Sequence, residues 1–314
     1  MKTTKTMFIL MLMLVGALLL IGCQAKQTAK TVKIGFMTPL SGDAASYGLS
    51  ILKGAQLAVK EANLPNVQLV VEDSKCNPKE AVSAVNKLIS VDGVQVILGE
   101  VCSGATLAAA PIAAQNKVPM ISAASTSPEL SKQEWVFRTV PSDALQGAFG
   151  AELVTKEGYY KLAVLYSNEE YGLGFNNVLK KEFVGDDREV VASEPFDRGT
   201  VDLRRQLTKI KAAKPEAIYI ISNSPDSAVA ALKQIKELHI QAALFGSEGL
   251  KSEDIVKGAG KAAEGLLLST MSGGSVEFAA KHRAEYGSEP GPFAAQAYDA
   301  YKAIAMALEQ GGKS

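Results

Sequence analysis

Hydrophobic and polar positions along residues 32–310 follow two alternating patterns. Short runs rich in Val, Ile and Leu, typical of buried strands, give way to longer stretches with apolar residues three or four apart, typical of amphipathic helices. The predicted strands are 32–37, 67–71, 94–98, 118–122, 161–166, 189–196, 217–221, 242–245 and 265–269. The predicted helices are 47–63, 78–89, 103–116, 145–156, 171–183, 201–212, 225–238, 276–286 and 293–310.

This alternation predicts an α/β protein of parallel sheets with helices on both faces. The pattern runs twice, which indicates two doubly wound lobes of similar build joined by a hinge. We expect one lobe from residues 32–140 with 272–314 and the other from 141–271. The chain stops soon after its last helix, where a parallel sheet normally continues to another strand, so we expect a fold truncated at its C-terminus.

The first 22 residues have the plan of a secretory signal. Two lysines precede the uncharged run Met7–Ile21, which is shorter than the roughly 20 residues of a spanning helix. Leu20-Ile21-Gly22-Cys23 resembles the lipobox of bacterial lipoproteins, in which cleavage precedes the cysteine and its thiol carries lipid. We therefore expect a signal peptide over 1–22, lipid on Cys23 and a polar tether over 23–31, with an uncleaved signal anchor as the alternative.

Charge and hydropathy restrict the partners that the chain can have. The 33 basic and 33 acidic residues balance without a polybasic stripe, so charge gives no support for nucleic-acid binding. Beyond the signal no apolar run approaches 18 residues, so membrane contact is expected only through the lipid. We expect an extracytoplasmic monomer, lipid-anchored to a bacterial cell membrane.

Two further cysteines, Cys76 and Cys102, remain once Cys23 carries lipid. An even pair in an exported protein favours a disulfide. Each cysteine follows a predicted strand, which puts both at the same edge of one sheet. Two unpaired buried thiols are the alternative, and a metal site is disfavoured because two cysteines without nearby histidines form a poor ligand set.

Sequence signatures of catalysis are weak throughout. His239 and His282 have no nucleophile nearby in the sequence. Gly246-Ser247-Glu248-Gly249 lacks the spacing of a nucleophile elbow, and Gly258-Ala259-Gly260-Lys261 lacks the rest of a phosphate loop. We therefore expect a protein that is not an enzyme and holds neither a metal nor a cofactor.

Two predicted helix starts carry the first part of a candidate binding site, because parallel sheets bind ligands beyond the C-terminal ends of their strands. Ser103 stands where a helix N-cap is expected, and Pro128 suits a first turn capped by Ser127 or Thr126. Two such starts side by side direct N–H groups at one edge and suit a carboxylate, since no basic residue accompanies them. Ordinary helix capping is the alternative for both.

Three further side chains complete the candidate site. Glu248 follows the strand 242–245, and a carboxylate there that faces a cleft is a partner for an ammonium group. A solvated loop residue is the alternative. Tyr47 and Tyr171 each precede glycine in a strand-to-helix connection, where each either covers a ligand or packs.

Taken in order, these segments resemble the branched-chain amino-acid-binding family of ABC-importer solute-binding proteins, which has the type I periplasmic fold. The resemblance runs from about residue 32 to 308 and is specific as an ordered set. It is carried by Thr38-Pro39-Leu40-Ser41-Gly42, Tyr47-Gly48, Cys76-Asn77-Pro78, Cys102-Ser103, Ile121-Ser122-Ala123-Ala124-Ser125-Thr126-Ser127-Pro128-Glu129-Leu130, Phe137-Arg138-Thr139, Tyr171-Gly172, Gly246-Ser247-Glu248-Gly249 and Ala263-Glu264-Gly265.

The resemblance implies how the two charged ends of an amino acid would be held. Ser103 and Thr126 resemble the residues that hold the α-carboxylate. The main chain at Ala124 and Ser125, with Thr126 and Glu248, resembles the ammonium site.

The resemblance also implies which residues surround the ligand side chain. Tyr47, Val101 and the disulfide partner Cys102 resemble its wall, and Tyr171 resembles a lid from the second lobe. Asn223 stands where the leucine-binding type has an aromatic residue, which leaves the side-chain preference open.

The expected function follows from these roles. The protein would capture a branched-chain or other aliphatic amino acid by hinge closure and present it to the permease subunits of an ABC importer. The alternatives are a tethered ligand-sensing receptor domain, and the same fold binding an amide or an aromatic acid.

Overall fold

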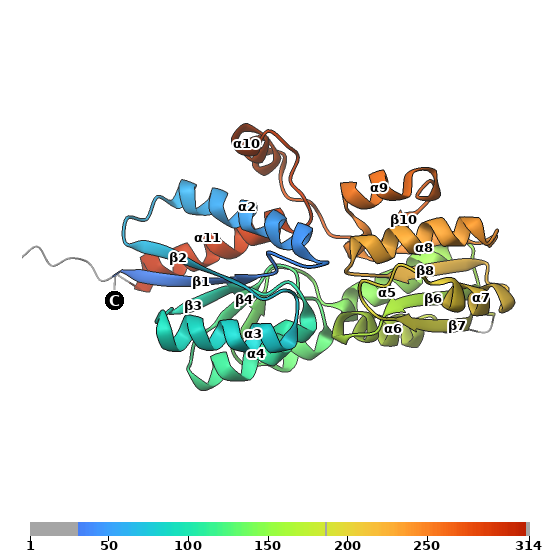
Figure 1. The fold of residues 1–314 in the computed structure, drawn as a ribbon, viewed down its shortest axis with the longest axis horizontal. Helices are drawn as coiled ribbons and strands as arrows, with labels where there is room; N and C mark the ends of the chain where they lie inside the picture. The colour runs from blue at the N-terminus through green and yellow to red at the C-terminus, as the bar shows by residue number, and fades with distance from the viewer. Residues whose placement is uncertain (1–30, 186, 312–314) are drawn as a thin grey trace, which may run out of the picture. The chain divides into compact units, whose positions relative to one another are not determined.

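The computed structural model describes residues 31–185 and 187–311 (Figure 1). The predicted signal peptide, Cys23 and the tether up to residue 30 lie outside the described residues. The chain divides into the units Met1–Thr31 and Val32–Ser314, and the second unit contains all the elements described below.

The first sheet has five parallel strands in the order β2-β1-β3-β4-β5. Helices cover both of its faces, with α2 and α11 packed together on one side and α3 and α4 packed together on the other (Figure 1). The strands are β1 (Val32–Thr38), β2 (Val67–Asp73), β3 (Val96–Gly99), β4 (Met120–Ser122) and β5 (Val136–Arg138). The helices are α2 (Ala45–Ala62), α3 (Pro78–Asn86), α4 (Ser103–Gln115) and α11 (Ala294–Gly311).

The second sheet also has five parallel strands, in the order β10-β9-β8-β6-β7. Its strands are β6 (Lys161–Ser167), β7 (Glu189–Phe196), β8 (Ala217–Ile221), β9 (Ala243–Gly246) and β10 (Leu267–Leu268). The helices that follow its strands or lead into them are α5 (Asp143–Lys156), α6 (Glu170–Glu182), α7 (Arg204–Ala212), α8 (Pro225–Glu237) and α9 (Glu253–Ala259). The helix α10 (Val276–Tyr286) contacts α2 of the first sheet.

Burial along the strands explains why the sequence forms sheets covered on both faces. The central strands β3 and β8 are buried at every residue, as expected where helices cover both faces of a parallel sheet. In β8, Ile218 and Ile220 pack into one apolar cluster, whereas Tyr219 and Ile221 pack into another. Successive strand residues point to opposite faces, so one strand contributes to the core on both sides of the sheet.

These observations confirm the predicted fold class of two parallel-sheet α/β lobes. Some boundaries differ from the prediction. The helix expected from 201 begins at Arg204, because the Gln234 side chain donates to the Val201 carbonyl and accepts from the Leu203 N–H, which holds this segment outside the helix. The helix expected from 145 begins at Asp143, since the Ser142 hydroxyl accepts from the Ala144 N–H and caps it.

The chain passes between the two sheets in two segments, 139–142 and 269–275. Gln296, on α11, contacts both of them. Its carbonyl accepts from Thr139 Oγ1 at 2.8 Å, and its Nε2 donates to the Ser272 carbonyl at 2.8 Å. The two segments are therefore held to the same residue.

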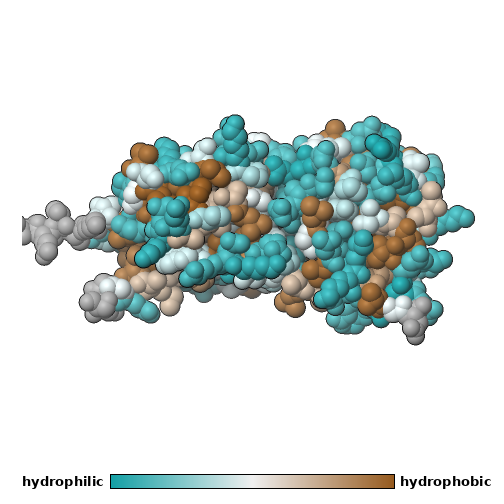
Figure 2. Space-filling view, turned by 90° about the horizontal axis from the view of Figure 1, so that it is seen from below, coloured by the Kyte–Doolittle hydropathy of each residue, from teal (hydrophilic) through white to brown (hydrophobic). Residues whose placement is uncertain are grey.

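On the face that Figure 2 shows, the surface is mostly hydrophilic and hydrophobic residues gather in several separate patches. Among residues 31–185 and 187–311, no helix is long and apolar enough to cross a membrane.

Candidate ligand-binding site

The junction between β3 and α4 presents Ser103 as the first residue of a 13-residue helix. The N-cap is Cys102, so the expectation that Ser103 caps this helix is wrong. The Ser103 hydroxyl instead accepts from the Ser127 N–H at 3.2 Å, and the Ser103 side chain is buried. No described residue accepts the Ser103 hydroxyl proton, so this proton can be donated to a ligand oxygen at the positive end of the helix dipole.

Cys76 and Cys102 form a disulfide, with their Cα atoms 5.4 Å apart. The structure therefore contains the predicted bond, which joins the start of α3 to the start of α4. Asn77 caps α3 through its side-chain oxygen, which accepts from the N–H groups of Lys79 and Glu80.

The segment after β4 is fixed by hydroxyl groups. Ser122 donates to the Glu100 carbonyl and accepts from the N–H groups of Ala124 and Ser125. The Ser125 hydroxyl bonds to the carbonyls of Glu100 and Val101. The Ser125 hydroxyl therefore joins the segment after β4 to the segment after β3, and its role is to stabilise these two segments.

The predicted second helix start has the expected cap. The segment Pro128–Lys132 is a short 3-10 helix, and the Ser127 hydroxyl accepts from the Glu129 N–H. Thr126, just before it, is buried and donates its hydroxyl to Asp143 Oδ2 at 2.9 Å.

Glu248 is buried in the second lobe, in the 3-10 turn Glu248–Leu250 that follows β9. Its Oε2 accepts from Gln146 Nε2 at 2.5 Å. Burial raises the pKa of Glu248 to about 7, although hydrogen bonding to Tyr171 and Gln146 opposes this rise. The predicted alternative of a solvated loop glutamate is thereby excluded.

Two tyrosines lie over the site from the two lobes. Tyr47 Oη, on α2, donates to the Gly249 carbonyl at 2.7 Å and so joins the lobes. Tyr171 Oη, on α6, donates to Ser247 Oγ at 2.8 Å. Arg198 adds a second inter-lobe contact, because it donates to Asp43 at 3.1 Å and to the Cys76 carbonyl at 2.8 Å.

Residues of both lobes line one narrow cavity. Every predicted binding residue lines it except Ser125 and Thr126, which are buried beside it. The cavity is lined by Tyr47, Val101, Cys102, Ser103, Ala124, Tyr171, Asn223, Glu248, Gly249 and Phe293.

Asn223 is distinct among these residues. Both polar atoms of its amide are buried, and neither has a hydrogen-bond partner among the described residues. A buried amide without partners is costly, so this group suits a ligand or water that supplies them.

Phe293, Gly249, Asp143 and Gln146 belong to the site or its support, but the sequence did not single them out. Phe293 precedes α11 and contacts the Tyr47 ring edge to face, with centroids 6.2 Å apart. Asp143 and Gln146 lie on the first turn of α5, and the cap residue Ser142 was the only local signal for that turn.

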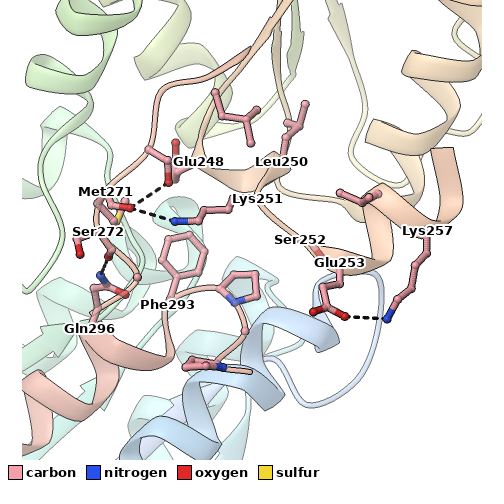
Figure 3. Close-up of a pocket in the computed structure, with 17 residues that line it drawn as sticks. Glu248, Leu250, Lys251, Ser252, Glu253, Lys257, Met271, Ser272, Phe293 and Gln296 are labelled. Atoms are coloured by element: carbon pink, nitrogen blue, oxygen red, sulfur yellow. Dashed lines mark hydrogen bonds and ion pairs between the residues drawn. The ribbon is translucent and has the colours of Figure 1, made fainter. Parts of the chain in front are cut away.

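A second and larger hollow adjoins the cavity and shares Glu248 and Phe293 with it (Figure 3). Lys251 and Gln296 are part of the lining of this hollow. Lys251 Nζ donates to the carbonyl of Met271, another lining residue, at 3.3 Å. Within the described part of the chain, no cluster of His, Cys, Asp or Glu has the arrangement of a metal site.

The comparisons with known proteins agree with this geometry. A family model described as periplasmic binding protein matches residues 31–314. The chain belongs to this family. This periplasmic binding protein is 30% identical over 300 residues to the "Leucine-, isoleucine-, valine-, threonine-, and alanine-binding protein" of Pseudomonas aeruginosa, an alignment covering 91% of this chain and 80% of the relative.

Solved structures with the same fold hold two classes of ligand. The branched-chain amino acid transporter substrate binding protein LivJ of Streptococcus pneumoniae, in complex with isoleucine, superposes with a TM-score of 0.80 at 30% identity, covering 89% of this chain and 84% of that one. A solute binding protein of an ABC transporter from Rhodopseudomonas palustris, in complex with 3,4-dihydroxy benzoic acid, gives a TM-score of 0.80 at 26% identity, covering 90% and 82%.

These findings confirm the family resemblance found in the sequence and the type I periplasmic fold. Proteins of this family bind solutes and are not enzymes, so the prediction that this periplasmic binding protein is not an enzyme is confirmed. Membership of the family also implies an extracytoplasmic location.

Proposed function

We propose that the chain is the extracytoplasmic substrate-binding component of an ABC importer and captures an α-amino acid with a branched-chain or other aliphatic side chain. The lobes 32–140 with 272–314 and 141–271 would close around the ligand, and the closed form would be presented to the permease subunits. The observation that carries this proposal is that Ser103 and Glu248 line the same narrow cavity from different lobes. Ser103 supplies a hydroxyl that can donate a hydrogen bond, and Glu248 supplies a carboxylate that can accept one.

The carboxylate end of the ligand would lie against Ser103. Its hydroxyl is free to donate, and the N-terminus of α4 supplies partial positive charge at the same place. The ammonium end would lie against Glu248, whose buried carboxylate is stabilised by a cation. Only a closed form provides both sets of contacts, so the ligand favours closure.

The remaining lining residues would contact the ligand side chain. Tyr47, Val101, Cys102 and Phe293 offer mostly apolar surface, which supports an aliphatic side chain. The named ligands of the Pseudomonas aeruginosa relative have side chains of this size.

Truncation of Glu248 tests the proposal. Glu248→Ala should weaken amino-acid binding by about 2–5 kcal/mol, because the ligand ammonium would lose its buried partner. A thermal-shift screen of the twenty amino acids identifies the ligand, since binding raises the melting temperature by mass action. Isothermal titration calorimetry then compares the variant with the original protein, and unchanged affinity for that ligand would refute the assignment.

A second candidate is a solute with a hydrogen-bonding group in place of the aliphatic side chain, such as an amide or an aromatic acid. The unpartnered amide of Asn223 supports it, as does the bound 3,4-dihydroxy benzoic acid in the Rhodopseudomonas palustris structure. Including aromatic carboxylates and amides in the thermal-shift screen distinguishes the two. A tethered ligand-sensing receptor domain is the alternative role, and pull-down of permease subunits with the ligand-bound protein tests for the importer.

We also propose that Cys23 carries lipid and anchors a monomer to the membrane. The lipobox-like sequence Leu20-Ile21-Gly22-Cys23 supports it. Cys23→Ser should release the protein from the membrane fraction, and a variant that stays membrane-bound would argue for an uncleaved signal anchor. Size-exclusion chromatography with light scattering measures the oligomeric state.

A further inference from the structure

We propose that the Cys76–Cys102 disulfide is a thiol-exchange site, at which a small thiol attacks Cys102 and Cys76 leaves as a thiolate held by Arg198. The inference goes beyond the proposed binding function, because the exchange needs no captured solute. It also gives a chemical role to Arg198, which does not line the ligand cavity.

The disulfide lines a surface hollow that is separate from the ligand cavity. Cys76 and Cys102 both line this hollow, together with exposed residues of each lobe, Pro78 from the first and Glu170 and Asp197 from the second. Each cysteine is at most 3% exposed, so large reagents are kept away from the sulfurs. The hollow gives a small thiol an approach to them. Cys102 lines the ligand cavity as well and so borders both spaces.

Arg198 makes the two sulfurs chemically unequal. Its Nη1 carries two N–H groups, and it donates to the Cys76 carbonyl at 2.8 Å and to Cys76 Sγ at 2.7 Å. Its Nε donates to Asp43 at 3.1 Å, which holds the guanidinium in place. A cationic donor against a sulfur stabilises the thiolate form, and the cysteine with the more stable thiolate leaves faster in an exchange.

Cys102 has weaker support for a thiolate. Among the described residues, no lysine or arginine donates to its sulfur, and its N–H donates to Glu100 Oε2, a buried carboxyl, at 2.6 Å. Cys102 is the N-cap of α4, where the helix end carries about half an elementary positive charge. The full charge of a guanidinium in direct contact outweighs this partial charge, so Cys76 is the better leaving group and Cys102 is the sulfur attacked.

The backbone beside the disulfide is strained. Lys75 and Cys76 have φ angles of 50° and 55°, in the left-handed region that non-glycine residues rarely adopt. They are the only adjacent pair of non-glycine residues in this region within 31–185 and 187–311. Such a conformation persists only where its surroundings hold it, and here the disulfide holds Cys76. Breaking the S–S bond would let this turn relax, which favours the exchange.

The exchange needs no reagent besides the thiol. The thiolate of the small molecule forms a bond to Cys102 Sγ, the S–S bond breaks, and its electron pair goes to Cys76 Sγ. The incoming sulfur is oxidised and the sulfur of Cys76 is reduced. The products are a mixed disulfide on Cys102 and a thiolate on Cys76, and the proton of the incoming thiol goes to the buffer.

Charge around the hollow favours a thiol that carries an ammonium group. Glu169, Glu170 and Asp197 line the hollow, whereas Arg198 is the one cationic residue of its lining. Cysteamine is therefore a suitable probe. Because Cys102 also lines the ligand cavity, the attached group should hinder solute binding, and this consequence alone rests on the proposed function.

Peptide mapping tests which sulfur is attacked. The protein is treated briefly with cysteamine, freed thiols are alkylated with iodoacetamide, and the non-reduced digest is analysed by mass spectrometry. Cysteamine should be on Cys102 roughly tenfold more often than on Cys76, which should be alkylated instead. Arg198→Gln should lose this selectivity and Arg198→Lys should keep most of it. Arg204→Gln is the matched control, because Arg204 is an exposed arginine of the same lobe.

The other outcomes would contradict the inference. Cysteamine spread equally over both cysteines, found mainly on Cys76, or found on neither would overturn it, as would unchanged selectivity in Arg198→Gln. If Arg198→Gln does not fold, mapping of the original protein still decides which sulfur leaves. A thermal-shift measurement with leucine tests the consequence, since modification should abolish a shift that the unmodified protein shows. Absence of a shift in the unmodified protein would count against leucine as the solute and not against the exchange site.

Discussion

The Tyr47 hydroxyl donates to the carbonyl oxygen of Gly249 at 2.7 Å, across a separation of 202 residues. The bond joins α2 of the first lobe to the turn that carries Glu248 in the second, and both residues line the ligand cavity. In the closure that we propose, the lobes would bury this polar contact beside the ligand.

Tyr47→Phe should weaken ligand binding by about 1 kcal/mol, since it removes one hydrogen bond of the closed form and retains the ring. Calorimetry with the ligand from the screen measures this. Tyr160→Phe is the control, because Tyr160 is 43% exposed and does not line the cavity. Equal affinity of Tyr47→Phe and the control would show that this bond does not contribute to closure.

Removal of the disulfide should lower stability. Cys76 and Cys102 are 26 residues apart, and in the chain-entropy model closing a loop of this length contributes roughly 3–4 kcal/mol. The double variant Cys76→Ala, Cys102→Ala should unfold at lower denaturant concentration than the original protein. A reductant should destabilise the original protein and leave the double variant unaffected; a double variant as stable as the original would contradict the expectation.

The empty protein should become less stable as the pH rises toward 7. Glu100 is buried, and burial raises the pKa of this carboxyl to about 7 despite hydrogen bonds from Ser74 and the Cys102 N–H. The folded protein therefore binds this proton more tightly than the unfolded chain does. Its stabilising contribution is largest below about pH 4, near the ordinary pKa of glutamate, and is lost as the pH rises through 7.

Glu100→Gln should flatten that dependence by at most about 3 kcal/mol, the value of a pKa difference between 4.5 and 7. Urea unfolding at pH 4, 5.5, 7 and 8 measures it. Glu134→Gln, an exposed acid of the same lobe, should leave the dependence unchanged. A pH profile of Glu100→Gln that matches the original protein would assign the dependence to other groups.

Asn223→Leu should distinguish the two ligand classes. The substitution replaces a buried amide without partners by an apolar side chain, which should raise the melting temperature of the empty protein. If the ligand is aliphatic, its affinity should rise or stay constant. If the ligand bonds to the amide through its own polar side chain, its affinity should fall by at least tenfold.

The sequence predicted most of the fold because strands buried on both faces leave a strong hydrophobic pattern, as in β3 and β8. It missed β5, in which no residue is fully buried and one of the three is the charged Arg138. It also missed α9, whose seven residues are too few for a clear helical period. Boundaries shifted where a distant side chain holds the backbone, as Gln234 holds Val201 and Leu203.

Some residues of the candidate site could be predicted from the sequence, and others could not. Ser103, Ala124 and Glu248 follow strand ends, and the general rule for parallel sheets brought them together. Asp143 and Gln146 do not follow strand ends, so their approach to Thr126 and Glu248 depends on how α5 packs, which local sequence does not specify. The change of Ser103 from a cap to an acceptor for Ser127 likewise depends on a residue 24 positions away.

Gln296 restricts how the lobes can separate. The residue bonds to Thr139 in one crossing segment. It also bonds to Ser272 in the other segment (Figure 3), so both connections are held to one residue. Sliding of one lobe past the other would break these bonds, whereas rotation about that point retains them. We therefore expect the lobes to open by rotation about Gln296, and the Tyr47–Gly249 hydrogen bond to break when they open.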